Sequence, residues 1–128
     1  MRLWHYQLIP YLDRQHLLAQ HRECCALRGN GWGRKHATIN YVFKYLPDTL
    51  FQYHCLVMKE MINRNYNFDW HWKYPEYRGK YHEIYGIYYP SIRMNYPEHD
   101  KEYLIECINL LKQKKAPMDF EKIERELL

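Results

Sequence analysis

Glu23 is the first candidate for acid–base chemistry in this sequence. His16, Gln20 and Glu23 follow one another at i, i+4 and i+7, so they share one polar stripe of a predicted helix. Arg22 precedes Glu23 and would keep its carboxylate ionised. An ordinary surface pair of Arg22 and Glu23 explains the same pattern, and the pattern alone favours that simpler explanation.

A glycine-rich turn followed by three basic side chains comes next. The five residues from Gly29 to Gly33 include three glycines, so the backbone can lie close to another surface. Arg34, Lys35 and His36 follow directly. This combination is typical of a phosphate clamp, and a plain surface loop explains it equally well.

No motif in the sequence indicates a metal or nucleotide site. The patterns HExxH, CxxC, GxSxG, GxGxxG and the Walker loop do not occur. His16, His21 and His36 are able to bind phosphate, to transfer protons, or only to cap helices and pack. Two adjacent cysteines on a helix would not both point into one metal site, so free and mostly buried thiols are the simpler interpretation of Cys24, Cys25, Cys55 and Cys107. We therefore expect neither a metal nor another cofactor.

The composition is that of a small, basic, aromatic-rich protein. The 128 residues suit one domain, residues 1–128, and carry a formal net charge of +4, which fits a phosphate-binding face without requiring one. Fourteen tyrosines and four tryptophans suit base stacking as well as half-buried surface packing. No apolar run of membrane-spanning length and no signal peptide is recognisable, so we expect a cytoplasmic monomer without a membrane partner.

The elements that would position these residues are helical. We predict an all-α, single compact domain of about three to four helices with long ordered aromatic-rich loops. A short arm, 1–11, precedes a helix capped by Asp13 at 14–27, a helical stretch at 37–45, and a helix at 49–63 capped by Asp48. Residues 65–96 lack helical periodicity and form the aromatic-rich loop, which a helix at 101–115 and an amphipathic turn or two at 119–128 follow.

The helix that carries Glu23 resembles the first helix of the bacteriophage pyrimidine-dimer DNA glycosylases. Residues 15–23 follow that family's form Gln-His-Leu-x-Ala-x-x-Arg-Glu. The segment 36–41 resembles its His-x-Thr-aromatic segment, 59–67 resembles the end of its next helix, and 75–81 resembles its Glu-aromatic-Arg-Gly-x-Tyr motif. The order of these motifs over residues 1–81 makes the resemblance fairly specific.

The resemblance implies a base-flipping DNA glycosylase whose nucleophile is the N-terminal α-amine. An α-amine has a pKa of about 7.7–8.0, so much of it is neutral near pH 7. The amine forms a Schiff base with the opened sugar, and β-elimination then cleaves the strand, which is apurinic-site lyase activity. The implied catalytic residues are Met1 and Glu23. We expect the damaged duplex DNA to be bound by Arg2, His16, Arg22, Arg28, Trp32, Arg34, Lys35, His36, Tyr77 and Arg78.

Several positions depart from the family pattern. Arg2 follows Met1, and Met before Arg is normally retained, so the amine would belong to Met1; a one-residue insertion before Gln15 agrees with this. Ala26 stands where the family has an arginine, with Arg28 as the nearest substitute. The segment before His36 is shorter, and the chain ends in Glu-Arg-Glu-Leu-Leu rather than in an aromatic tail.

The leading hypothesis is a metal-independent glycosylase with lyase activity on UV-induced pyrimidine dimers. Other bulky bases and bare abasic sites stay open as lesions. The alternative is a non-catalytic nucleic-acid-binding protein of the same fold, which a retained Met1 favours and the Arg22–Glu23 pair opposes. A structural helical protein is the third hypothesis, and absence of salt-dependent DNA affinity would support it.

Overall fold

The computed structural model describes residues 2–80 and 95–128, and every regular element among them is a helix. The elements in chain order are η1 (Tyr6–Tyr11), α1 (Arg14–Arg28), η2 (Asn40–Lys44), α2 (Pro47–Asn63), η3 (Trp70–Lys73), α3 (Lys101–Gln113) and α4 (Phe120–Leu127), where η denotes a 3₁₀ helix. The all-α prediction is confirmed. In the described part of the chain, no helix is long and apolar enough to cross a bilayer.

The first helix begins where the sequence predicts. The side chain of Asp13 accepts a hydrogen bond from the backbone N–H of His16, which satisfies one of the free donors at the start of α1. Leu17, Cys24 and Leu27 form the buried side of the helix. Gly29 ends it by donating its N–H to the carbonyl of Cys25.

The second long helix starts two residues earlier than predicted. Leu46 is its N-cap and Pro47 occupies its first position, so Asp48 lies inside the first turn and does not cap the helix. The proline decides the start, because its ring presets the helical φ and the N–H it lacks would have no partner there. Leu50, Val57 and Met61 of α2 are buried, as the periodicity predicts.

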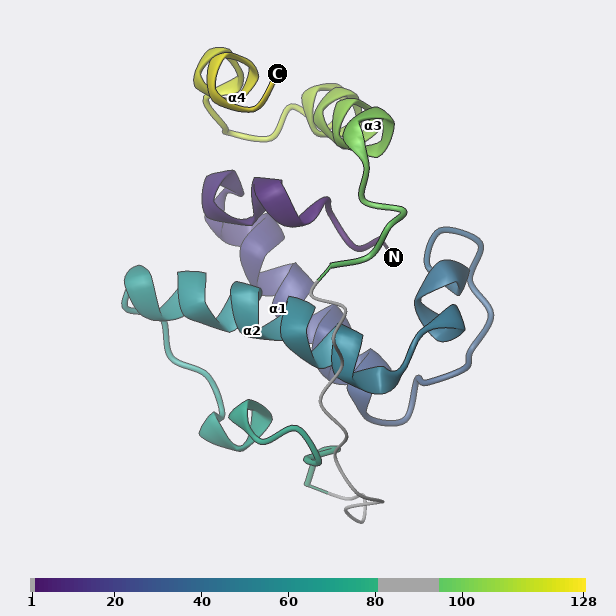
Figure 1. Ribbon diagram of the computed structural model, residues 1–128. Coiled ribbons are helices and arrows are strands. Elements are labelled where there is room, and N and C mark those ends of the chain that lie inside the picture. Colours follow the sequence, from purple (N-terminus) through teal and green to yellow (C-terminus); the bar gives the residue numbers. More distant parts are fainter. Residues whose placement is uncertain (1, 81–94) are drawn as a thin grey trace.

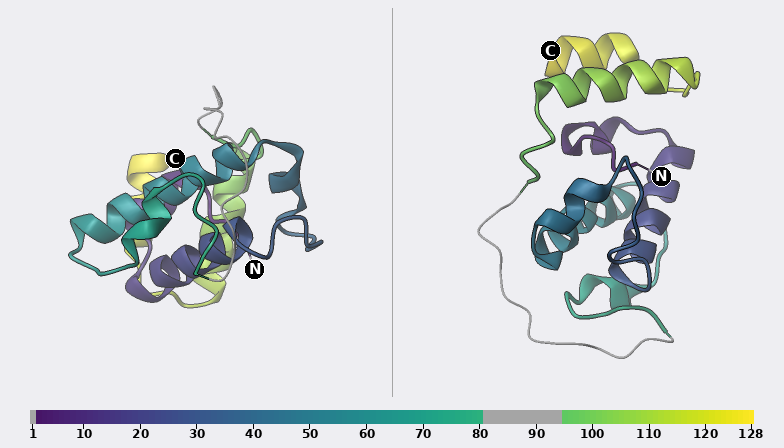
Figure 2. Two further views of the ribbon diagram at one scale, coloured as in Figure 1. Left: turned by 90° about the horizontal axis from the view of Figure 1, so that it is seen from below. Right: turned by 90° about the vertical axis from the view of Figure 1, so that its right-hand side faces the viewer.

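Two layers of helices enclose the N-terminal segment. In Figure 1, α1 and α2 pack across each other in one layer and α3 and α4 lie together in the other, with η1 between them. The further views in Figure 2 show the same order. Leu3, Leu8 and Ile9 of the N-terminal segment are fully buried between the layers. The predicted short arm is therefore a central part of the core.

The remaining elements are shorter or longer than the sequence suggests. The predicted helical stretch at 37–45 is only the five-residue η2, whereas the amphipathic turn or two predicted at 119–128 is the eight-residue α4. The third long helix begins after its cap Asp100 and ends at Gln113, two residues before the predicted end. The aromatic-rich loop contains η3, and its residues 81–94 lie outside the described part of the chain.

We predict that Gly29→Ala destabilises this arrangement. A Cβ atom on Gly29 would lie 2.9 Å from the backbone oxygen of Arg78 and 3.2 Å from that of Cys25. The backbone would have to move, so we expect the free energy of unfolding to fall by about 1–3 kcal/mol in urea denaturation. Asn30→Ala at the exposed neighbour is the control and should stay within about 0.5 kcal/mol of the wild type. Equal stability of both variants would contradict the close packing of the segment at Arg78 against the end of α1.

Candidate active site

A hollow of about 310 Å³ opens beside the polar stripe of α1. Four segments surround it: the chain start, α1, the loop before η2, and the end of α3. Its walls are Arg2, Trp4, His16, Ala19, Gln20, Glu23, His36, Thr38, Leu110 and Lys114. Four of the ten wall residues, Arg2, His16, Glu23 and His36, are among those predicted for the site, although they are up to 34 positions apart in the sequence.

Glu23 turns its carboxylate toward the start of the chain. Its Oε2 atom accepts hydrogen bonds from the backbone N–H of Arg2 at 3.4 Å and from Nε2 of Gln20 at 3.0 Å. Burial raises the pKa of the Glu23 carboxyl above its ordinary value, while the hydrogen bonds from Arg2 and Gln20 act in the opposite direction by favouring the charged form. The raised pKa brings this acid closer to the range in which a side chain can both give and accept a proton.

Gln20 is the residue that joins Glu23 to the chain start. Its side chain is 1% exposed. The Oε1 atom accepts from the N–H of Trp4 at 2.8 Å and lies 3.0 Å from the hydroxyl of Tyr53, whose one proton it shares with the carbonyl of Trp4. The Nε2 atom donates to the carbonyl of Arg2 at 3.1 Å and to Glu23. All four hydrogen-bonding positions of this amide are therefore used.

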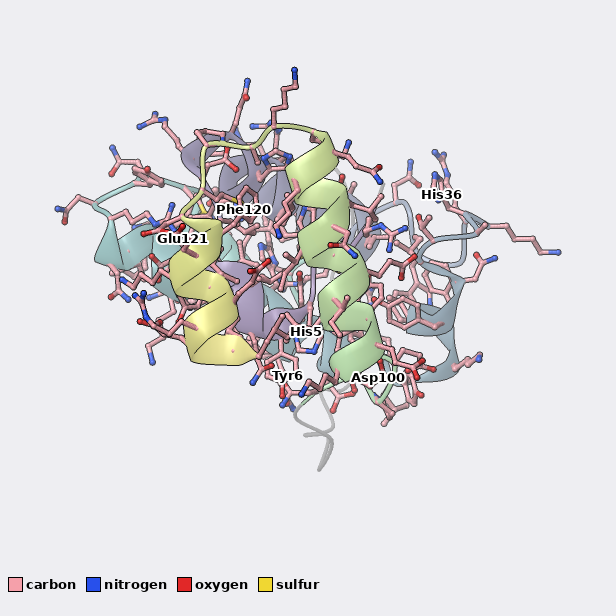
Figure 3. All side chains as sticks on the ribbon, turned by 90° about the horizontal axis from the view of Figure 1, so that it is seen from above. His5, Tyr6, His36, Asp100, Phe120 and Glu121 are labelled. Carbon is pink, nitrogen blue, oxygen red and sulfur yellow. The ribbon has the colours of Figure 1, made fainter. Side chains whose placement is uncertain are left out.

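Two tyrosines hold the same segment from the other helices. The hydroxyl of Tyr53 on α2 donates to the carbonyl of Trp4 at 2.6 Å, and the hydroxyl of Tyr103 on α3 donates to the carbonyl of Leu3 at 2.6 Å. In Figure 3, His5 and Tyr6 lie near Asp100 at the beginning of α3. Residues 2–6 are thus held against α1, α2 and α3 together.

The basic wall residues have fixed partners. The guanidinium of Arg2 lies 3.7 Å from the carboxylate of Glu106 and 5.6 Å from the ring centre of Tyr103. Nδ1 of His16 lies 2.7 Å from Oδ1 of Asp13, the cap of its own helix. These contacts orient the guanidinium of Arg2 and the imidazole of His16 at the wall of the hollow.

His36 approaches the hollow from the loop before η2. Its Nδ1 lies 2.9 Å from the hydroxyl of Thr38, and its backbone N–H donates to the side chain of Asn40 at 2.8 Å. Figure 3 shows it on the loop that projects beyond α3. Arg34 and Lys35 of the same loop, and Arg22 on α1, are exposed.

Arg28 has a different position from the one expected of a DNA-binding residue. It is 5% exposed, and its guanidinium donates to the carbonyls of Trp72 at 2.6 Å and Tyr74 at 2.7 Å. In this arrangement Arg28 offers no exposed group to DNA. The guanidinium instead holds the segment 72–74 against the end of α1, because buried N–H groups require acceptors.

The other predicted residues lie around that end of α1. Trp32 packs edge-on against Phe43, and Tyr77 packs edge-on against Trp72. The guanidinium of Arg78 donates to the carbonyl of Arg28 at 3.3 Å. None of these three lines the hollow at Glu23. Met1 lies outside the described residues.

Sequence reasoning missed Gln20, Tyr53 and Tyr103 as parts of this site. The predicted polar stripe includes Gln20, but nothing in the stripe indicates that it is buried under the chain start. Lys114, which lines the hollow from the end of α3, was also missed. A signal for it would have required knowing that α3 crosses over the N-terminal segment.

A second group of polar side chains lies on the opposite side of α1. His21 and Cys25 on α1 and His54 on α2 each offer one donor atom, and the three atoms lie within 4.8 Å of one another. No other group of three or more potential metal ligands occurs in the described part of the chain. The motif search misses it because His54 is 29 positions from Cys25.

A comparison with models of protein families identifies the family of this chain. The family model of pyrimidine dimer DNA glycosylases matches residues 1–74, more than half of the chain. The chain belongs to the pyrimidine dimer DNA glycosylase family. The match includes η1, α1, η2, α2 and η3, and with them Arg2, His16, Arg22 and Glu23. No curated protein and no solved structure matches the chain.

We predict that Gln20 controls the protonation of Glu23 in this family member. Gln20→Met removes a donor to the carboxylate while burial is retained, so the pKa of Glu23 should rise further. Gln20→Glu places a second negative charge beside the Glu23 carboxylate and should raise the pKa of Glu23 by about 1 or more. Carbon-13 NMR titration of the glutamate carboxyls measures both values. Gln15→Met, at an exposed position on α1, is the control and should leave the pKa unchanged, and an unchanged value in all three variants would contradict the prediction.

Proposed function

We propose that this chain is a DNA glycosylase with apurinic-site lyase activity that removes UV-induced pyrimidine dimers through an imine on its N-terminal amine. The observation that carries the proposal is the hydrogen bond of 3.4 Å between the Arg2 nitrogen and the Glu23 carboxylate at the edge of an open hollow. Family membership supports the glycosylase reaction. We take residues 1–128 as one catalytic domain.

Covalent geometry supports the amine as nucleophile. Three bonds separate the α-amine of Met1 from the Arg2 nitrogen, so in any conformation the two nitrogens are within about 4 Å of each other. The α-amine is therefore within about 7 Å of the Glu23 carboxylate. The proposal requires that this amine is free.

The reaction proceeds through an imine on that amine. The damaged nucleotide turns out of the duplex, because its sugar is otherwise inaccessible. The neutral amine attacks C1′ while the bond from C1′ to the base breaks, and the base leaves with the bonding electrons and takes up a proton. The amine nitrogen then loses a proton, the bond from C1′ to O4′ breaks, and O4′ takes up a proton, which opens the sugar ring and gives the protonated imine.

Glu23 transfers the protons in this reaction. As a carboxylate it stabilises the cationic imine and then removes a proton from C2′. The electron pair released forms a double bond to C3′, and the 3′ phosphate leaves, which cuts the strand. Water finally hydrolyses the imine and restores the amine. The raised pKa of Glu23 suits a group that takes a proton in one step and gives it back in another.

The basic side chains around the hollow suit phosphate binding. Arg2, His16, His36 and Lys114 line its walls, and the exposed Arg22, Arg34 and Lys35 extend the positive surface along α1 and the following loop. Their contacts would hold the duplex backbone without reading its sequence. We retain Trp32, Tyr77 and Arg78 as candidates for contacts near the flipped nucleotide.

We predict a borohydride-trapped covalent adduct with duplex DNA that carries a thymine dimer, and with duplex DNA that carries an abasic site. Borohydride reduces an imine between protein and DNA to a stable amine, so a covalent adduct reports the amine chemistry. Glu23→Gln should lower the trapping rate by about 100-fold or more, because a proton-transferring group is lost. Gln15→Glu, an isosteric change at an exposed position of the same helix, is the control.

An N-terminally acetylated protein should form no adduct. Mass spectrometry of the intact, unmodified protein checks that its N-terminal amine is free. Adducts with abasic DNA alone would support the proposed lyase activity and contradict the pyrimidine dimer as the substrate. Tight binding without any adduct would favour the non-catalytic nucleic-acid-binding alternative.

We predict that exposed cations set the salt dependence of DNA binding. Replacing Arg22 or Lys35 by Ala should each reduce the slope of log K against log salt by about 1, because one phosphate contact is lost. Lys59→Ala, an exposed lysine on α2 that does not line the hollow, should leave the slope unchanged. Fluorescence anisotropy at several salt concentrations measures the slopes. Equal slopes in all variants would argue against the proposed DNA surface.

A further inference from the structure

The side of α1 that faces α2 carries a histidine and a cysteine one turn apart. His21 and Cys25 are four positions apart on the helix, so their side chains are neighbours. His54 reaches the same place from α2 and is 0% exposed. Since α1 and α2 pack directly on each other, as Figure 1 shows, these donors stand on rigid elements rather than on loops.

The separations of the donor atoms are close to those of a tetrahedral metal site. Nδ1 of His21 lies 2.9 Å from Nε2 of His54, and Sγ of Cys25 lies 3.9 Å from the first and 4.0 Å from the second. Zinc bonds of about 2.0–2.1 Å to nitrogen and 2.3 Å to sulfur would require separations of about 3.3 Å and 3.6 Å. Side-chain shifts of a few tenths of an ångström would bring all three atoms onto one ion.

We propose that His21, Cys25 and His54 form a binding site for a transition-metal ion of the zinc class. Two imidazoles and one thiolate select zinc and its neighbours over magnesium or calcium, which prefer oxygen. Three protein ligands leave a fourth position for water or another ligand. The site is separate from the hollow at Glu23 and does not depend on the proposed glycosylase reaction.

Access to the site is from the side of Cys25. Cys25 lines a second hollow, of about 420 Å³, together with Trp72, Gly29 and Gly31. His54 is closed off from solvent, so an ion would approach past the thiol and meet the two imidazoles behind it. The fourth position then faces this hollow.

Arg28 lowers the affinity of the site for an ion, because its hydrogen bond to His54 must break when the ion binds. Its Nη1 lies 2.8 Å from Nδ1 of His54. A guanidinium only donates, so Nδ1 accepts and the proton of His54 is on Nε2, the atom that faces His21. An ion on Nε2 replaces that proton, and the ring then carries N–H on Nδ1, which faces Arg28. Arg28 must therefore give up this one contact, while its bonds to the carbonyls of Trp72 and Tyr74 can remain.

The experiment is a titration of the metal-free, reduced full-length protein with Co²⁺, followed by displacement with Zn²⁺. We expect one equivalent of Co²⁺ to produce a thiolate-to-cobalt absorption band, and Zn²⁺ to remove the band and raise Tm. Cys25→Ala should abolish the band. Cys55→Ala, a half-buried thiol on α2, is the matched control and should retain it. Arg28→Met should bind Co²⁺ about 10-fold more tightly, because the competing donor is lost.

A second measurement covers the case in which a variant does not fold. In the wild-type protein, Zn²⁺ should protect Cys25 from alkylation by iodoacetamide and leave Cys55 as reactive as before. The proposal is overturned if Co²⁺ gives no thiolate band and Zn²⁺ leaves both Tm and the alkylation of Cys25 unchanged. It is also overturned if a band persists in a folded Cys25→Ala protein.

Discussion

One buried amide determines how the chain start and the acidic residue are placed. Gln20 is almost fully buried at the wall of the hollow and makes four hydrogen bonds, to Trp4, Tyr53, Arg2 and Glu23. A buried polar group without its partner costs about 1–3 kcal/mol, so none of these bonds is easily given up. The N-terminal segment and Glu23 are therefore held in place by the same side chain, and neither can move without the other. An amine nucleophile at the chain start needs such a constraint, because a free terminus would otherwise sample many positions.

The two sides of α1 separate two kinds of polar environment. The side with Gln20 and Glu23 borders an open hollow with basic walls, where a charged group can be solvated or meet phosphate. The other side, with His21 and Cys25, is partly covered by α2 and by the segment that Arg28 holds, and it opens at Cys25 into the second hollow. There the polar atoms satisfy one another, and Arg28 decides which ring nitrogen of His54 carries the proton. A fifteen-residue helix can serve both sides because its 3.6-residue period separates Glu23 from Cys25 by more than half a turn.

The sequence predicts those features that local rules determine. The cap Asp13 and the position of α1 follow from capping and apolar spacing, and the structure agrees. The start of α2 was predicted wrongly, because Asp48 was preferred as a cap over the proline before it. The hollow was partly predictable, because helical spacing places His16, Gln20 and Glu23 on one stripe of α1 and the family motif also marks His16 and Glu23. Gln20, Tyr53 and Tyr103 could not be assigned, since their partners are backbone atoms of residues 2–4, and no pattern indicates where that segment runs.

The N-terminal segment gives the candidate site a defined shape. Its apolar residues Leu3, Leu8 and Ile9 are fully buried between the two helix layers, so the segment is held by hydrophobic packing as well as by hydrogen bonds. Burial of Leu3 and the neighbouring Trp4 leaves Arg2 as the first described residue that reaches the hollow. In the proposed mechanism, an additional residue before Met1 would displace the amine by up to about 3.6 Å and put a peptide bond in its place, so the proposed reaction would require a free Met1 amine as directly as it requires Glu23.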